Sequence, residues 1–414
     1  MRRMLFEPSR HEPLRAPPWS AQRARDAIGW IVRETNAALT PSSYRPVHPK
    51  DLEPGGDSAM VSTSLYFGAA GVVWALGHLH ALGACDATVA GQVELTKLRD
   101  DNRAWLRGEG FEEFGSYLMG DLAIELMAWG RAPGAARADA LAGLIDSNID
   151  HPARELMWGS PGSLLAATFL HQQTRDARWA ALVRRIAAQL RSELQWSDAY
   201  GCHHWLQHLY GQRCSYLDGV HGFVATAHGL LRARDVLDAE QWAFWQSCIA
   251  ETVVRSATQE GGLANWRPEL IVPEGKQPRY LMQFCHGAPG FVICLARFPG
   301  DALDALLLAA GEAIWAAGPL TKGSNLCHGT AGNAYAFLML HERTRNPLWL
   351  ERARAFAMHA IAQAEADAAQ YGQLRYSLWT GDLGLAIFLC DCIRAQGRFP
   401  TLDVFFSATE GRPH

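Results

Sequence analysis

The sequence predicts an all-α fold in which helical hairpins are arranged in a closed ring. Apolar residues recur with the helical period, whereas alternating runs of β-branched residues are almost absent. In addition, a Gly-x-x-Gly step followed by a small, apolar helix recurs seven times along the chain. Because one hairpin cannot bury both of its faces, neighbouring hairpins must stack, and closing the ring leaves no exposed end.

The helical period is clearest in two segments. Residues 184–194 place three apolar side chains on one helix face, namely Ile186, Leu190 and Leu194. Residues 349–362 place four on one face, namely Trp349, Ala353, Phe356 and Ala360. Both segments are therefore predicted to be amphipathic helices.

The repeated step marks the start of each inner helix. The copies begin at Gly68, Gly120, Gly159, Gly222, Gly287, Gly329 and Gly381, with Ala in the second glycine place of copies two and four. Glycine allows close backbone approach where the inner helices converge. Successive copies are 39 to 65 residues apart, which leaves room for two helices and a connection in each.

We expect a single domain overall. Residues 1–55 are predicted to form an N-terminal arm and the first outer helix, and residues 56–400 to form the ring. The longest gaps between copies contain residues 196–219 and 261–278, which are predicted to be long loops. Long loops in compact domains are often functional.

Composition excludes several classes of protein. Hydrophobic residues make up 49% and charged residues 19%, which is typical of a globular chain. The net charge of −4 argues against a nucleic-acid partner.

The most apolar run, residues 302–318, carries Asp304 and Glu312, so no transmembrane segment is expected. The N-terminus lacks the apolar stretch of a signal peptide. Nine cysteines, an odd number, fit reduced thiols and a cytoplasmic location.

Three copies carry metal-competent residues just before their first glycine. Copy five has Cys285 and His286, copy six has Cys327 and His328, and copy four has His221. Because the inner-helix starts converge, we expect Cys285, Cys327 and His328 to meet. Two thiolates and one imidazole suit Zn²⁺, and three protein ligands leave a fourth position open, as in catalytic zinc sites. One zinc ion per chain is predicted.

The chain resembles the lanthionine synthetase C family, most closely its stand-alone LanC-like branch. The resemblance covers about residues 60–390, and its specific signature is the sequence CHGTAGNAYAF. The matching stretches are FCHGAPG (284–290), LCHGTAGNAYAFL (326–338), VHGF (220–223), ELMWGSPGSLLA (155–166), YLMGDLA (117–123) and YSLWTGDLG (376–384). The resemblance implies a double α-toroid, an (α/α)7 barrel with seven inner and seven outer helices around zinc.

The resemblance also implies an activity and its residues. Family members add thiols to dehydroalanine or dehydrobutyrine; bacterial members cyclise lanthipeptide precursors, and LanC-like members use glutathione. The implied partners are glutathione and a dehydrated peptide or protein. By the same resemblance, Cys285, Cys327 and His328 are the zinc ligands, His221 is the acid or base, and Lys322 lies near bound glutathione.

Two departures from the cyclase pattern favour the LanC-like branch. The cyclases have Arg four residues before the first zinc cysteine, where this chain has Leu281, with Arg279 two residues earlier. They also have Tyr directly after that cysteine, where this chain has His286. We therefore take Lys322, His286 and Arg279 as substrate-binding candidates. The cyclases' catalytic Asp has no secure match, and Asp121 is the candidate in the corresponding repeat.

Three alternatives to glutathione addition stay open. A lanthipeptide cyclase would form thioether rings within one peptide, and a zinc- and glutathione-binding scaffold would bind without turnover. An unrelated toroid, such as a glycosidase or an isoprenoid cyclase, would need paired carboxylates or Asp-rich motifs, and no Asp-rich motif stands at an inner-helix start.

Other residues that can carry chemistry are assigned structural roles. His203, His204 and His208 lack an acidic partner in the right frame and are expected on a polar loop face. Cys390 and Cys392 are expected in the core. Most tryptophans are expected there too, with Trp205 and Trp379 as candidates for the mouth of the ring. Asp382 and Asp121 also suit the first turn of a helix, where a carboxylate complements the helix dipole.

Overall fold

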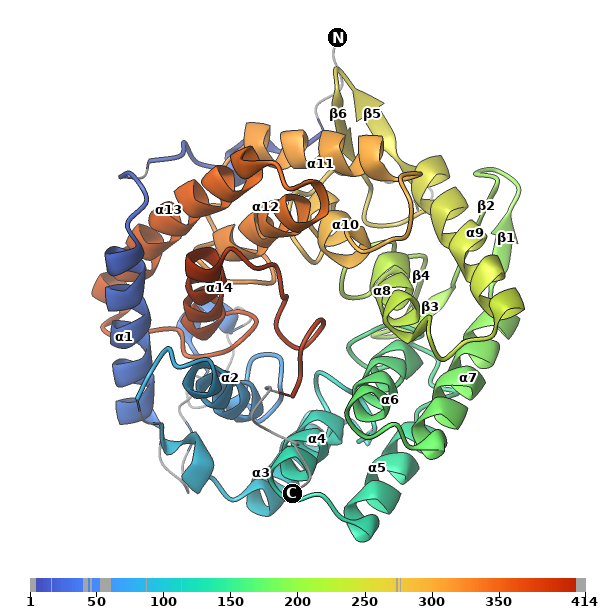
Figure 1. The fold of residues 1–414 in the computed structure, drawn as a ribbon, viewed down its shortest axis with the longest axis horizontal. Coiled ribbons are helices and arrows are strands. Elements are labelled where there is room, and N and C mark those ends of the chain that lie inside the picture. The colour runs from blue at the N-terminus through green and yellow to red at the C-terminus, as the bar shows by residue number, and fades with distance from the viewer. Residues whose placement is uncertain are drawn as a thin grey trace.

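Fourteen α-helices form two concentric rings in the part of the chain that the structure describes (Figure 1). The structure, a computed structural model, describes residues 5–406 apart from residues 16, 40–43, 45–46, 53–60, 87, 113, 273–274 and 276. The prediction of an all-α double toroid is confirmed. The predicted boundary between residues 55 and 56 lies outside the described residues.

Helices of the two rings alternate along the chain. The outer ring consists of α1 (Ala21–Ala38), α3 (Leu95–Gly108), α5 (Ala135–Ser147), α7 (Ala177–Ser192), α9 (Ala239–Ser256), α11 (Asp304–Ala317) and α13 (Pro347–Tyr371). The inner ring consists of α2 (Ala69–Ala81), α4 (Leu122–Arg131), α6 (Ser160–Thr174), α8 (Phe223–Ala233), α10 (Ala288–Leu295), α12 (Thr330–Thr344) and α14 (Asp382–Arg394). Packing of α1 against α14 joins the two ends of the chain and closes the ring.

Burial follows the position of each helix in the two rings. The inner helix α12 is buried on every side from Thr330 to Leu340, because it packs against both neighbouring inner helices and the outer ring. The outer helix α7 is amphipathic and buries Ile186 and Leu190 as predicted, but it ends before Leu194. The predicted helix that begins near Trp349 is part of α13 and buries all four of its predicted apolar residues.

Main-chain hydrogen bonds link neighbouring repeats where the inner helices begin. In six of the seven copies, a main-chain N–H two or three residues before the first glycine donates a hydrogen bond. The acceptor is the carbonyl of the residue two before the first glycine of the next copy around the ring. We call this set of bonds the backbone belt. It consists of Tyr66 N to Leu118 O, Leu118 N to Met157 O, Leu156 N to Val220 O, Cys285 N to Cys327 O, Cys327 N to Trp379 O and Trp379 N to Tyr66 O, at 2.8 to 3.2 Å. The belt fixes how the starts of the inner helices face one another.

Antiparallel hairpins lie within the first predicted long loop and at the start of the second, which is a correction to the sequence prediction. They are formed by β1 (Gln195–Ser197) with β2 (Cys202–His204), β3 (Gln207–Leu209) with β4 (Gln212–Cys214), and β5 (Thr258–Glu260) with β6 (Leu263–Asn265). Each strand has only three residues, too few for alternation to be recognised in the sequence. Short 3-10 helices occur at η1 (Pro8–Arg10), η2 (Pro49–Asp51) and η3 (Val89–Gln92).

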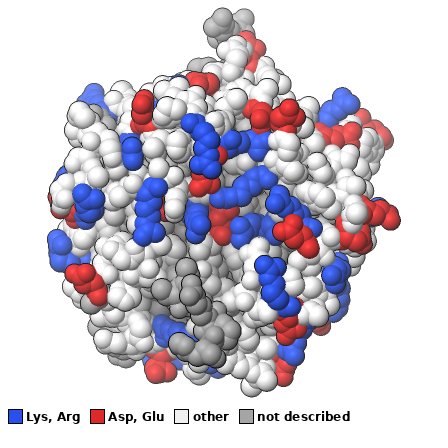
Figure 2. Space-filling view, viewed as in Figure 1, with Lys and Arg blue, Asp and Glu red and all other residues white. Residues whose placement is uncertain are grey.

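The surface carries charges of both signs. On the face drawn in Figure 2, several Lys and Arg side chains (blue) lie near the centre, and acidic side chains (red) lie beside them. Among the ion pairs of the described residues, Arg297 binds both Asp403 and Glu342. Within the described residues, none of the helices combines the length and the apolar character needed to cross a bilayer.

The repeat glycines predict a sharp difference between two alanine substitutions. A Cβ on Gly332 would overlap the carbonyl oxygen of Leu326, which belongs to the turn before α12, whereas a Cβ on Gly143 of α5 meets nothing within 4 Å. We expect Gly332→Ala to lower the free energy of unfolding by about 3 kcal/mol or more. Gly143→Ala should raise it by about 0.5–1 kcal/mol. Urea unfolding of both variants checks this, and equal effects would contradict the packing described.

A buried carboxyl predicts a pH dependence of stability. Burial raises the pKa of Asp391 to about 7, although its hydrogen bond from Tyr335 opposes the shift. The folded state therefore holds this proton more tightly than the unfolded chain, and the stability that it contributes is lost as pH rises from about 4 to about 7. As the pH rises across that range, the free energy of unfolding of Asp391→Asn should increase relative to that of the wild type, by no more than about 4 kcal/mol. Urea unfolding of both proteins at pH 5 to 8 tests this. The control is Asp235→Asn, at an exposed position, whose free energy of unfolding relative to the wild type should show no such trend.

Candidate metal centre

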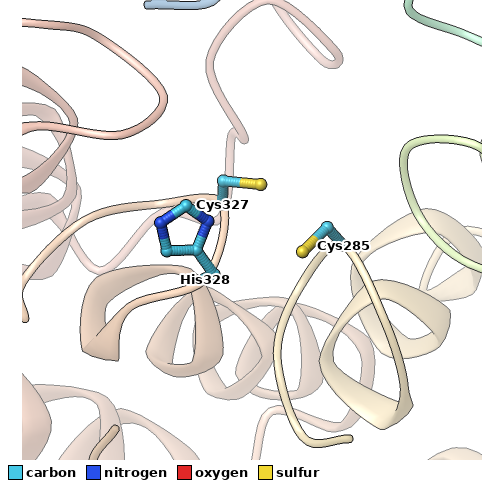
Figure 3. A group of neighbouring side chains, drawn as sticks. All are labelled: Cys285, Cys327 and His328. Carbon is cyan, nitrogen blue, oxygen red and sulfur yellow. The ribbon is translucent and has the colours of Figure 1, made fainter. Parts of the chain in front are cut away.

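Cys285, Cys327 and His328 lie together where α10 and α12 begin (Figure 3). One ligand atom from each residue lies within 4.8 Å of the others. Cys285 precedes α10 and the other two residues precede α12, and the belt bond from Cys285 N to Cys327 O holds the two segments together. Both cysteines are buried and His328 is partly exposed, so the cluster is accessible from one side.

Hydrogen-bond donors face both sulfur atoms. Tyr66 Oη donates to Cys327 Sγ at 2.8 Å, and Gln283 Nε2 donates to Cys285 Sγ at 3.0 Å. Burial and the neighbouring Cys327 raise the pKa of Tyr66, which keeps the phenol protonated as a donor. Donors directed at sulfur suit thiolates, and two thiolates with one imidazole suit a soft ion such as Zn²⁺. The residues present therefore fit a metal of this kind.

The N-terminal segment also reaches this centre. Arg10 Nη2 donates to Gln283 Oε1 at 3.0 Å, and Gln283 in turn contacts Cys285. Backbone hydrogen bonds between this segment and residues 319–321, just before Lys322, hold it in place. Sequence reasoning described only an extended arm and missed Arg10, which lies 273 residues from Gln283 and has no local signal.

His221 is paired with a buried glutamate. Glu155 Oε2 lies 2.8 Å from His221 Nδ1, and the carboxylate also accepts the main-chain N–H groups of Met157 and Trp158 at 2.8 and 2.6 Å. Burial disfavours the charged imidazole, but the hydrogen bond and charge of Glu155 outweigh this effect and raise the pKa of His221 to about 9. His221 therefore carries a proton at neutral pH, with Nδ1 directed to Glu155.

His286 has a similar carboxylate partner, Asp218. Asp218 Oδ2 lies 2.8 Å from His286 Nδ1, while Oδ1 accepts the amides of Val220 and His221 at 2.9 and 2.8 Å. Burial opposes protonation of His286, but the nearby Asp218 charge contributes to a raised pKa. The ring of Tyr216 lies about 6 Å from both imidazoles (6.0 Å from His221 and 5.9 Å from His286). The two histidines thus form one wall beside the cysteines.

Glu155 and Asp218 occupy the same repeat position, four residues before the first glycine. That position is polar in every copy, and its residues are Ser64, Ser116, Glu155, Asp218, Gln283, Asn325 and Ser377. Several of these side chains accept main-chain N–H groups of the turn, as Asn325 does from His328 at 3.0 Å. Sequence reasoning missed both carboxylates. Aligning the copies on their glycines would have revealed that only copies three and four have an acid there.

Three of the predicted site residues, Asp121, Arg279 and Lys322, form no described contact with the cluster of cysteines and histidines. Asp121 is buried and pairs with Asn102 and Arg103 of α3, so it supports an inner-helix start. Arg279 is exposed and pairs with Glu7 at 2.9 Å. Lys322 is exposed, lies five residues before Cys327, and has no ion pair within the described residues.

The residues assigned structural roles lie as follows. Trp205 and Trp379 are fully buried rather than at the mouth, which corrects that expectation: Trp205 packs on Phe223 and Trp379 on Phe284. His203, His204 and His208 lie on β2 and β3 and form no metal-competent group in the described chain. Cys390 and Cys392 are buried free thiols.

Comparison with known proteins gives a consistent match. Residues 135–404 match a family model described as lanthionine synthetase C-like protein. Glutathione S-transferase LANCL1 of Danio rerio is 27% identical over 270 residues, covering 60% of this chain and 62% of the relative. LanC-like protein GCL1 of Arabidopsis thaliana is 34% identical over 140 residues, covering 32% of each chain. The matched region thus spans about three fifths of the first relative and one third of the second.

A solved structure shares the fold. Nisin cyclase superposes with a TM-score of 0.58 at 14% sequence identity, covering 95% of this chain and all of that one. At this identity the likeness establishes the helical toroid and nothing about the reaction.

The geometry of the cluster predicts metal content. We expect about one zinc ion per wild-type chain and at least about 100-fold weaker binding in Cys327→Ala, since one of only three ligands is lost. Elemental analysis after dialysis measures this. Cys85→Ala, which removes a half-buried cysteine outside the cluster, is the matched control and should keep its metal. Equal metal content in the two variants would contradict the assignment.

Proposed function

Because the chain belongs to the lanthionine synthetase C-like family, we propose that it is an enzyme that adds a thiol, with glutathione as the thiol, to dehydroalanine or dehydrobutyrine residues. The proposal is carried by one observation: the Cys285, Cys327 and His328 cluster lies beside His221, whose Nδ1 is 2.8 Å from the buried carboxylate of Glu155. The acceptor is a dehydrated peptide or protein. The name of the zebrafish relative, a glutathione S-transferase, supports the choice of thiol.

The chain's own ligands would hold the metal. Cys285, Cys327 and His328 would bind Zn²⁺ and leave one position open for a substrate group. When bound there, zinc supplies Lewis acidity that lowers the pKa of a coordinated thiol, so that thiolate is present at neutral pH. Tyr66 and Gln283 hold the two cysteine sulfurs through hydrogen bonds.

His221 is proposed as the proton donor to the acceptor. The lone pair of the thiolate forms the new carbon–sulfur bond at the β-carbon of the dehydroamino acid, and the π pair of the broken Cα=Cβ double bond moves into the enolate. The enolate then needs one proton at Cα, and a protonated His221 supplies it. The thiol loses one proton and the acceptor gains one, so the addition balances without an oxidant or reductant. Glu155 orients the ring and stabilises its charged form.

Cations at the mouth are proposed to hold glutathione. Lys322 lies just before Cys327 and has no ion-pair partner in the described chain, so its ammonium is available to a carboxylate. Arg10 is the second cation near the cluster. The Arg279 pair with Glu7 is exposed and therefore weak, so this guanidinium can exchange to a substrate carboxylate. Asp218 fixes His286 on the same wall, where its imidazole can contact substrate.

The proposed role of His221 predicts a large kinetic effect. His221→Ala should lower turnover of a dehydroalanine peptide with glutathione by about 100- to 10,000-fold, while metal content stays unchanged. Glu155→Gln should have an intermediate effect, because the ring keeps a hydrogen-bond partner but loses the charge that favours its protonated form. Adduct formation is followed by mass spectrometry.

His171→Ala is the matched control, since this histidine is partly exposed at the end of α6, outside the candidate site. It should react at the wild-type rate. Unchanged turnover in zinc-loaded His221→Ala would contradict the proton-donor role. Glutathione binding without any adduct in the wild type would instead favour a binding scaffold, and ring formation within one peptide would favour a cyclase.

A further inference from the structure

An aromatic pocket is lined by Trp158, whose main chain is bound by Glu155, the partner of His221. Its volume is about 160 Å³, and its aromatic lining consists of Phe111, Trp158 and Tyr210. The other lining residues are His151, Pro152, Ala153, His208 and Leu209. The rings of Phe111 and Trp158 stack with centroids 4.7 Å apart at an interplanar angle of 26°. The lining contains no Asp, Glu, Lys or Arg, so the pocket suits an uncharged group.

One carboxylate connects the pocket to the proposed proton donor. Glu155 Oε1 accepts the main-chain N–H of Trp158 at 2.6 Å, and Oε2 lies 2.8 Å from His221 Nδ1. Trp158 precedes the first glycine of its copy, the position that His221 and His328 hold in theirs. Glu155 therefore holds both the main chain of Trp158, whose side chain lines the pocket, and the ring of His221.

Tyr210 is held in a backbone conformation that costs free energy. It forms the two-residue tip of the β3–β4 hairpin with Gly211, and both residues have positive φ (49° and 74°). Such tips favour Asn, Asp or Gly, and a bulky residue there costs about 1 kcal/mol. The residue is nevertheless 64% exposed, and its hydroxyl accepts the Trp158 indole N–H at 3.0 Å. A costly, exposed tyrosine points to a function of its side chain.

We propose that the aromatic pocket binds an apolar, preferentially aromatic, side chain of the acceptor peptide that neighbours the dehydroamino acid. This inference rests on the proposed function and adds a specificity element to it. A cavity of about 150 Å³ accommodates benzene, so the pocket has room for a phenyl ring. The stacked walls favour aromatic contacts. Acceptors with a charged or small neighbour at that position would lack this contact.

The first test compares acceptor peptides that differ only beside dehydroalanine, with Phe or Ala at that position. We expect wild-type kcat/KM to favour the Phe peptide by about tenfold or more, and Tyr210→Gly to reduce that ratio to near one. Tyr210→Phe keeps the ring and should keep the preference. Trp196→Ala removes an exposed aromatic side chain of the neighbouring β1–β2 hairpin and should also keep it.

Stability separates this role from a structural one. Glycine relieves the strained backbone at the hairpin tip, and this gain offsets the lost hydrogen bond from Trp158, so Tyr210→Gly should unfold close to the wild-type temperature. Loss of the preference in a stable variant supports the pocket. Retention of the preference in Tyr210→Gly overturns it.

A binding measurement keeps the inference separate from the reaction. The same peptides with Ala in place of dehydroalanine cannot react, and calorimetry gives their affinities for the zinc-loaded protein. Tighter binding of the Phe peptide that disappears in Tyr210→Gly supports the pocket even if no peptide is ever converted, in which case the proposed function alone fails. Equal affinities for both peptides in the wild type overturn the pocket.

Discussion

The backbone belt is the constraint on which the rest of the structure depends. Each bond joins the segment just before one inner helix to the same segment of the next copy, and the last bond returns from Trp379 to Tyr66. A copy with belt bonds on both sides cannot shift without breaking two of them. The repeat glycines make this possible, because the turn before each helix folds too tightly for a side chain. Cys285 and Cys327 are members of the belt, so the fold itself sets their separation.

The belt is interrupted between copies four and five, and the interruption lies at the candidate site. There the amide of Val220 donates to the side chain of Asp218, whose other oxygen reaches His286 in the next copy. A carboxylate thus replaces a main-chain link and positions two histidines. Glu155 has the same place in copy three and supports His221. In these two copies, an acid at this polar position of the repeat contacts a histidine as well as the main chain of its turn.

Sequence alone predicted what the repeat encodes and missed what depends on tertiary contacts. The glycine steps predicted the number of inner helices and their starting points, and hence that Cys285, Cys327 and His328 would lie together. Asp121 was chosen as an acid because of its repeat, whereas the carboxylate that contacts His221 is Glu155, four residues before a glycine. Strands of three residues are too short to show a periodic pattern in the sequence. The hydrogen bond from Arg10 to Gln283 joins residues far apart in the chain and has no sequence signal either. Trp205 is buried by long-range contacts with Phe223 and Trp245, which the sequence does not reveal.

The central claim is that the open position at Cys285, Cys327 and His328 receives the thiol of glutathione. X-ray absorption at the zinc edge, on the zinc-loaded protein with and without glutathione, tests it most directly because it counts sulfur ligands at about 2.3 Å. The account predicts two sulfurs in the protein alone and three after glutathione is added, with the third absent when the sulfur-free analogue ophthalmic acid is used instead. A spectrum that glutathione leaves unchanged at saturating concentration would contradict the claim.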